Sequence, residues 1–233
     1  LNVLSKKPEL YNCCCLSAPM LSFKTPPWPW AVAGALTNLF CSLGLGGMFA
    51  IGKPEYQWEA KYKQIPEQCT HSKRRNDIWV QQMADHPIIK LGGPSNQWVN
   101  ESFKMCNKFI SKWCSNSTTS NKFPLPVFLA SSGRDKFVHC SSQLSFYNSN
   151  SALTRFGEFP TSYHELLIEE EPTRNRVIGE SIKFIQFHDC LTLSEDFAIL
   201  QKYYNSKNGG GAVYGKMLVE EEGKGFKFEK GDP

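Results

Sequence analysis

The sequence lacks an apolar run suited to crossing a membrane. A spanning helix needs about 20 predominantly apolar residues, and the longest candidate, residues 28–51, is interrupted by Gly, Ser, Thr and Asn. The chain also lacks an initiating methionine and a signal-peptide pattern at its first residues. These absences argue against a transmembrane helix and a secreted protein. We expect a fragment of a longer, cytoplasmic protein.

No two cysteines have Cys-x-x-Cys spacing, although the chain contains nine cysteines, three of them consecutive at 13–15. Adjacent residues on a strand point to opposite faces, so this run does not suggest a disulfide. Cys69 with His71, and His139 with Cys140, each lack the two further ligands that a structural zinc site requires. We therefore expect reduced thiols and no metal site.

The chain also lacks a strong charge of either sign. Its 26 basic and 22 acidic residues give a net charge of +4 at pH 7. This weak and scattered charge does not indicate a nucleic-acid partner. It is compatible with peripheral contact with an anionic membrane surface, which in a cytoplasmic protein means the inner face.

Three short runs predict the strands of a parallel sheet, at residues 13–18, 126–130 and 152–159. The first is a continuous apolar run, which is typical of a strand buried on both faces. The second is an apolar run that ends abruptly in a glycine-containing turn. A helix-length segment separates the second run from the third, so the pattern indicates an α/β fold with a strand–helix–strand unit.

Two candidate catalytic residues follow these strands. Asp135 comes just after the second predicted strand, and His164, 29 positions later, comes just after the third. Two parallel neighbours would bring both residues to the same edge of the sheet. An Asp that holds a His in one tautomer forms two thirds of a Ser-His-Asp apparatus, here in the chain order Asp before His. Without further support, an Asp and a His on loops would be read as surface residues.

That support comes from the surrounding motifs. Asp135 opens Asp-Lys-Phe-Val after a Pro-Val-Phe-Leu strand, His164 lies in Tyr-His-Glu-Leu-Leu-Ile-Glu, and a predicted helix follows over residues 173–185. Together these motifs resemble the C-terminal end of the lysophospholipase L2 and monoacylglycerol lipase group of serine α/β-hydrolases. The resemblance implies that Asp135 is the catalytic acid and His164 the catalytic base. It implies no metal and no organic cofactor.

A long segment, residues 22–119, separates the first and second predicted strands. It is far longer than one crossover helix requires, so we expect an inserted helical cap. Two of its phrases, Thr-His-Ser-Lys-Arg-Arg from Thr70 and Leu-Gly-Gly-Pro-Ser-Asn-Gln-Trp from Leu91, resemble the cap of the lysophospholipase L2 proteins. The predicted domains are a partial α/β-hydrolase core (1–21 and 120–188), the cap (22–119) and a C-terminal tail (189–233).

Two features of the predicted cap leave alternatives open. Its scattered aromatic residues (Trp58, Tyr62, Trp79, Trp98 and Trp113) suit either a small core of the cap itself or a pocket for an acyl chain. Lys73, Arg74 and Arg75 suit either a solvated helix face or the recognition of a phosphate group.

The sequence contains no Gly-x-Ser-x-Gly motif, which carries the nucleophilic serine in α/β-hydrolases. The resemblance places this motif, and part of the oxyanion hole, upstream of Leu1. Ser17 lacks flanking glycines, and Ser131 and Ser132 precede Asp135 on the same predicted loop. We therefore expect the intact protein to hydrolyse lysophospholipids or monoacylglycerols, and this chain alone to be inactive.

Two other interpretations remain open at this point. The chain could be a non-catalytic binding or scaffold protein derived from a hydrolase that lost its nucleophile. It could also be the product of a broken reading frame. An in-frame Gly-x-Ser-x-Gly directly upstream of Leu1 would separate the enzyme from both.

Overall fold

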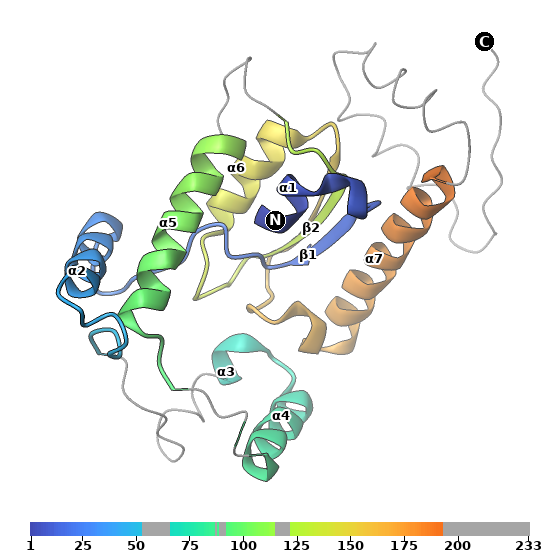
Figure 1. Cartoon of the computed structure of the whole chain (residues 1–233). Coiled ribbons are helices and arrows are strands. Elements are labelled where there is room, and N and C mark those ends of the chain that lie inside the picture. Colours follow the sequence, from blue (N-terminus) through green and yellow to red (C-terminus); the bar gives the residue numbers. More distant parts are fainter. Residues whose placement is uncertain (53–65, 87, 89–91, 115–121, 193–233) are drawn as a thin grey trace, which may run out of the picture.

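The computed structural model describes residues 1–52, 66–86, 88, 92–114 and 122–192. Its centre is a sheet of three parallel strands, β1 (Cys14–Ser17), β2 (Val127–Ser132) and β3 (Thr154–Phe159), with β2 in the middle (Figure 1). In the register, Leu16 lies opposite Leu129, and Leu129 lies opposite Phe156. The three predicted strands and their parallel pairing are confirmed.

The helices cover both faces of this sheet and build the segment between β1 and β2. They are α1 (Asn2–Lys6), α2 (Trp30–Ser42), α3 (Pro66–Cys69), α4 (Lys73–Asp85), α5 (Asn96–Trp113), α6 (Cys140–Asn150) and α7 (Glu171–Thr192). Two short 3-10 helices span Pro8–Leu10 and Leu166–Ile168. None of the helices in the described ranges is long and apolar enough to cross a membrane.

Strand β2 is buried along its whole length because apolar residues on both of its faces meet helices. Val127 and Leu129 belong to one core cluster, which includes Phe146 of α6 and packs against Leu1, Leu4 and Phe109. The alternate residues Phe128 and Ala130 belong to a second cluster, which includes Val177 and Phe184 of α7. This alternation follows from the twofold period of a strand and fixes a helix–sheet–helix arrangement.

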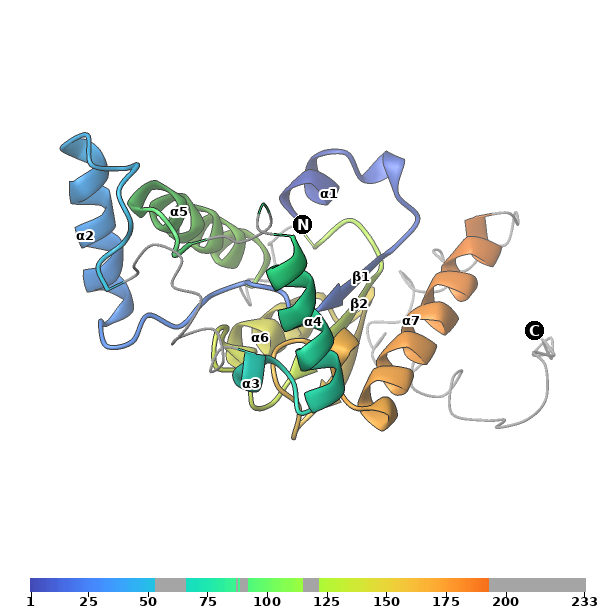
Figure 2. The same cartoon turned by 90° about the horizontal axis from the view of Figure 1, so that it is seen from below.

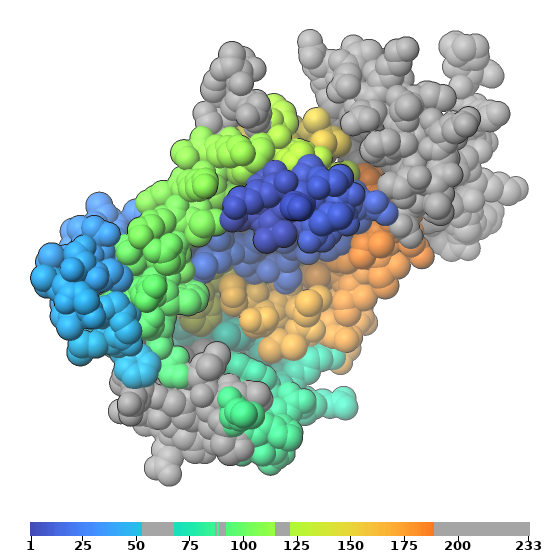
Figure 3. All heavy atoms as spheres, in the orientation of Figure 1, coloured from blue at the N-terminus to red at the C-terminus, as the bar shows by residue number. Residues whose placement is uncertain are grey.

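The described residues between β1 and β2 form helices and no strand of the sheet. Helix α2 lies outermost and packs on α5, as the two views of the ribbon and the space-filling picture show (Figures 1, 2 and 3). Phe23, Trp30 and Phe103 join these parts, with ring centroids 4.5–4.8 Å apart. The assignment of 22–119 as a separate cap domain stays a prediction.

Several predicted boundaries differ from the observed ones. Strand β2 continues through Ser131 and Ser132, which were expected on the loop, because polar residues remain compatible with the ladder until Gly133 turns the chain. Helix α7 continues to Thr192, four residues into the predicted tail, because no proline or glycine interrupts it there. The rest of that predicted tail, 193–233, lies outside the described residues.

Candidate active site

The loops that follow β2 and β3 lie in direct contact, and this contact requires a glycine. The Gly133 amide donates to the Phe159 carbonyl at 2.9 Å, and the Arg134 amide donates to the Ser162 carbonyl at 3.0 Å. A β-carbon on Gly133 would lie 2.3 Å from the carbonyl oxygen of Pro160, closer than atoms can approach. A residue without a side chain is therefore needed at the point where the two loops meet.

Asp135 is held by its own loop. Its Oδ1 accepts hydrogen bonds from the amides of Phe137 at 2.7 Å and Val138 at 2.9 Å, and its side chain is fully buried. Burial acts to raise the pKa of this carboxyl group. The hydrogen bonds from His164, Val138 and Phe137 outweigh burial, and the pKa lies below its ordinary value. Asp135 is therefore an ionised, fixed acceptor at neutral pH.

His164 completes a pair with Asp135, as predicted. Its Nδ1 lies 2.6 Å from Oδ2 of Asp135, and Phe137 meets its ring edge-on with centroids 5.3 Å apart. Burial acts to lower the pKa of His164, but the hydrogen bond and charge of Asp135, with the charge of Glu165, raise it above 6.5. Because the carboxylate accepts from Nδ1, the neutral ring carries its proton there and presents Nε2 as a base.

The outer nitrogen of His164 is available for proton transfer. The side chain is 25% exposed, and within the described ranges Nε2 has no hydrogen-bond partner. A buried carboxylate behind Nδ1 and an open Nε2 are what a general base in acyl transfer requires. The predicted contact is confirmed, whereas the catalytic roles of both residues stay a prediction.

In the described part of the chain, no hydroxyl or thiol donates a hydrogen bond to Nε2 of His164. Ser132 is fully buried and Ser131 nearly so, while Ser17 is exposed at the end of β1. Cys69 lies near the pair, but burial, with the charges of Glu165 and Asp135, raises the pKa of its thiol to about 12. Cys69 is therefore protonated and inert at neutral pH.

The structure brings together a second His–carboxylate pair that the sequence did not reveal. His71 Nδ1 donates to Oε1 of Glu169 at 2.9 Å, and its ring stacks on Tyr163 with centroids 3.9 Å apart. Residues 71 and 169 lie 98 positions apart, so no local spacing could have indicated the contact. Among the described residues no group of three potential ligands could hold a metal ion.

The basic run in α4 is partly engaged in the fold. Arg75 donates from Nη1 to the Glu169 carbonyl at 2.6 Å and from Nη2 to the Glu171 carboxylate. Lys73 pairs with Asp77 on the same helix at 2.8 Å. Arg75 therefore does not lie on a solvated helix face, and its bonds to Glu169 and Glu171 do not support phosphate recognition either.

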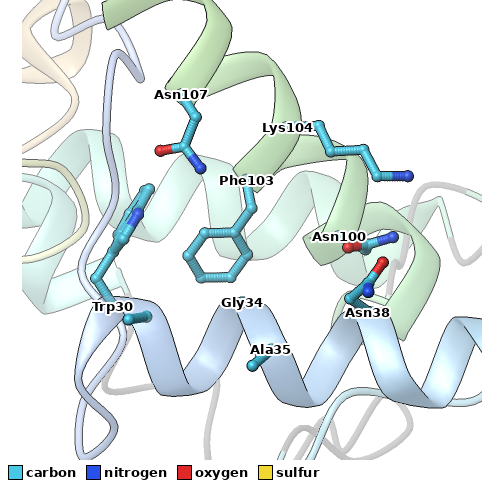
Figure 4. A pocket seen from close by; sticks show the side chains of 9 residues that line it. Trp30, Gly34, Ala35, Asn38, Asn100, Phe103, Lys104 and Asn107 are labelled. Carbon is cyan, nitrogen blue, oxygen red and sulfur yellow. The ribbon is translucent and has the colours of Figure 1, made fainter. Parts of the chain in front are cut away.

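Of the cavities in the described part of the chain that lie outside the Asp135–His164 pair, two are lined by aromatic or other apolar side chains. One of about 300 Å³ lies between α2 and α5, where Trp30 and Phe103 meet the amides of Asn38, Asn100 and Asn107 (Figure 4). The other, of about 600 Å³, lies between the end of β1 and α5. Its lining residues are mostly apolar and include Leu16, Pro19, Leu21, Met105 and Phe109.

Comparisons with known proteins agree with this arrangement. The family model described as serine aminopeptidase, S33, matches residues 1–171. The fold is similar to a soluble variant of monoglyceride lipase from Saccharomyces cerevisiae in complex with a substrate analog, with 13% identity, a TM-score of 0.54 and 75% of this chain covered. It is also similar to a monoacylglycerol lipase from Paleococcus ferrophilus, with 14% identity, a TM-score of 0.56 and 80% of this chain covered.

This chain spans 55% of the length of the first lipase and 63% of the second. The sequence matches no curated protein at a significant level. At these identities the structural likeness establishes the α/β-hydrolase fold, with the three parallel strands as its observed part.

Proposed function

Because this chain belongs to the serine aminopeptidase S33 family of α/β-hydrolases, we propose that it carries the acid–base part of a serine ester hydrolase. The observation that supports this proposal most strongly is the 2.6 Å contact between Asp135 Oδ2 and His164 Nδ1, with no partner for Nε2 among the described residues. A buried, ionised carboxylate fixes the tautomer and orientation of the imidazole, which a histidine needs to act as a general base.

In this proposal His164 transfers the protons of the reaction, and Asp135 orients the His164 imidazole. Nε2 would take the proton of a serine hydroxyl as the serine attacks the ester carbonyl, and the imidazolium would then protonate the leaving alcohol. Asp135 stays ionised and stabilises the imidazolium. Water would then attack the acyl-enzyme, with His164 again as the base. The sequence has no Gly-x-Ser-x-Gly motif to supply the serine, so we propose that the 233-residue chain alone is inactive.

We assign the substrate to the class of lysophospholipids and monoacylglycerols. The two similar structures are described as monoglyceride and monoacylglycerol lipases, and the groove of about 600 Å³ beside β1 offers an apolar lining suited to an acyl chain. Such substrates reside in membranes, so the proposal includes a cytoplasmic protein that contacts the inner membrane face. The net charge of +4 is compatible with that contact.

A second candidate is a non-catalytic binding or scaffold protein with a hydrolase fold. The absence of a Gly-x-Ser-x-Gly motif from the sequence favours it. The two candidates differ in whether the joined protein hydrolyses esters in a way that depends on His164, because only the enzyme needs Nε2 of this residue.

The test joins the chain to an upstream half that carries a Gly-x-Ser-x-Gly motif and follows fatty-acid release from monoacylglycerol and from lysophosphatidylcholine. The proposal predicts turnover by the joined protein, none by the 233-residue chain, and loss of turnover in His164→Ala. His86→Ala, a change at an exposed histidine, is the matched control and should retain activity. Turnover that survives His164→Ala would exclude the proposed role, and a folded joined protein without turnover would favour the binding protein.

A further inference from the structure

The loop that carries His164 is fastened to the segment between β1 and β2 by one buried carboxylate. Glu169 is 2% exposed and accepts four hydrogen bonds, two on each oxygen. Oε1 accepts from the Tyr163 amide at 2.8 Å and from His71 Nδ1 at 2.9 Å. Oε2 accepts from the amides of His71 at 3.0 Å and Glu170 at 3.2 Å.

A buried charge is stable only when its hydrogen-bonding capacity is filled. Burial acts to raise the pKa of Glu169, but the donors from Tyr163 and His71 lower it overall, so the group is ionised at neutral pH. Two of the four donors come from the loop after β3, and two come from His71, about a hundred residues earlier. The carboxylate therefore holds two distant segments together.

Further bonds reinforce the same junction. The Thr70 hydroxyl donates to the Ile168 carbonyl at 2.8 Å, and Arg75 donates to the Glu169 carbonyl at 2.6 Å. The Glu165 amide donates to the Cys69 carbonyl at 2.9 Å. In both ribbon views α3 and α4 lie beside the segment that leads into α7 (Figures 1 and 2).

These contacts bracket His164 on both sides along the chain. The amide of Tyr163, the residue before it, is held by Glu169, and the amide of Glu165, the residue after it, is held by Cys69. The ring of His164 is held separately, by its hydrogen bond from Nδ1 to Asp135. The backbone of His164 therefore has little freedom to move its ring away from Asp135.

We propose that Glu169 is a positioning residue for His164, which it fixes against Asp135 by clamping the His164 loop to the segment Cys69–Arg75. The inference rests on the proposed role of His164 and adds a second carboxylate to the apparatus, one that touches no reacting atom. It also couples the predicted cap to the proposed base, because displacement of Cys69–His71 would release the residues on both sides of His164.

The test compares the 233-residue chain with its Glu169→Gln variant. NMR of ¹⁵N-labelled imidazole groups follows His164 in both. An amide at position 169 places its NH₂ group against N–H donors, so the clamp should open. We expect the low-field proton signal of the bond between Asp135 and His164 to be lost and the pKa of His164 to shift down toward its ordinary value. Glu170→Gln, a change of an exposed neighbouring carboxylate, is the matched control and should leave both unchanged.

Far-UV circular dichroism establishes whether Glu169→Gln folds. If it does not fold, Thr70→Val decides instead. This change leaves Glu169 intact and removes two bonds of the Thr70 hydroxyl, the one it donates to the Ile168 carbonyl and the one it accepts from the Ser72 amide, so it should weaken the same signal. A folded variant with an unchanged His164 signal and pKa would overturn the positioning role, while leaving the proposed function intact. An ordinary His164 pKa in the unsubstituted chain would instead contradict the proposed function.

Discussion

Gly133 and Pro160 approach so closely that a β-carbon on residue 133 would lie 2.3 Å from the Pro160 carbonyl oxygen. This contact joins the loop of Asp135 to the loop of His164, and the amide of Arg134 completes it with a bond to the Ser162 carbonyl. The geometry of the candidate site therefore depends on a residue that has no side chain.

Gly133→Ala should destabilise the fold by about 3 kcal/mol, because backbone atoms must shift to admit the methyl group. The measurement is the urea dependence of unfolding, followed by circular dichroism. Gly179→Ala is the control, since a β-carbon at that position of α7 meets nothing within 4 Å. It should stabilise the helix by about 0.5–1 kcal/mol. Equal stability of Gly133→Ala and the unsubstituted chain would show that the two loops do not meet as described.

Asn150 at the end of α6 should be a second sensitive position. Its amide donates to the carbonyls of Trp113 at 2.7 Å and Phe146 at 2.8 Å and accepts from the Phe123 amide at 2.8 Å. Asn150→Ala leaves three buried backbone groups without this partner, at about 1 kcal/mol or more each. We expect a loss of about 3 kcal/mol in the free energy of unfolding.

Asn107→Ala is the control for that experiment, because Asn107 is exposed on α5. Its stability should change little, since alanine favours a helix. A similar small change in the free energy of unfolding for both variants would mean that the hydrogen bonds of Asn150 do not hold residues 113 and 123 together.

The contribution of Asp135 to stability should depend on pH. Its folded pKa is lowered, so its stabilisation is present above the unfolded pKa and is lost as the pH falls through the folded value. The pKa of His164 is raised, so its stabilisation is present below about 6.5 and is lost as the pH rises through the folded value. The pair should therefore stabilise the fold most at a pH above the unfolded pKa of Asp135 and below the unfolded pKa of His164.

Asp135→Asn should accordingly lower the free energy of unfolding by about 1.5–3 kcal/mol at pH 5–6, the range for a hydrogen bond to a charged group. The difference from the unsubstituted chain should shrink toward acid pH and decrease again at alkaline pH. Asp77→Asn, at an exposed pair on α4, should show neither the loss nor the pH profile. A cost of Asp135→Asn that is constant with pH would contradict an ionic pair.

The sequence predicted the part of this molecule that local patterns determine. Apolar runs located β1, β2 and β3, and the fact that parallel neighbours end at one edge placed Asp135 beside His164. The ends of β2 and α7 were less predictable, because serines can continue a strand and no breaker residue marks the end of that helix.

The role of Glu169 could not have been predicted in the same way. Its sequence neighbours indicated only an acidic turn before a helix, whereas its partner His71 lies 98 positions away. Such a contact depends on how the segment between β1 and β2 folds back, which no periodicity encodes.

Trp58 and Tyr62, expected to contribute to a pocket or to the core of the cap, lie outside the described residues.

We propose above all that Asp135 and His164 form a preformed acid–base pair within this chain. The most direct measurement is the NMR titration of the His164 imidazole in the 233-residue chain, compared with Asp135→Asn. We expect a His164 pKa raised above its ordinary value, a neutral ring protonated at Nδ1, and a downward shift of that pKa when Asp135 loses its charge. A His164 pKa at its ordinary value that does not respond to Asp135→Asn would contradict the claim.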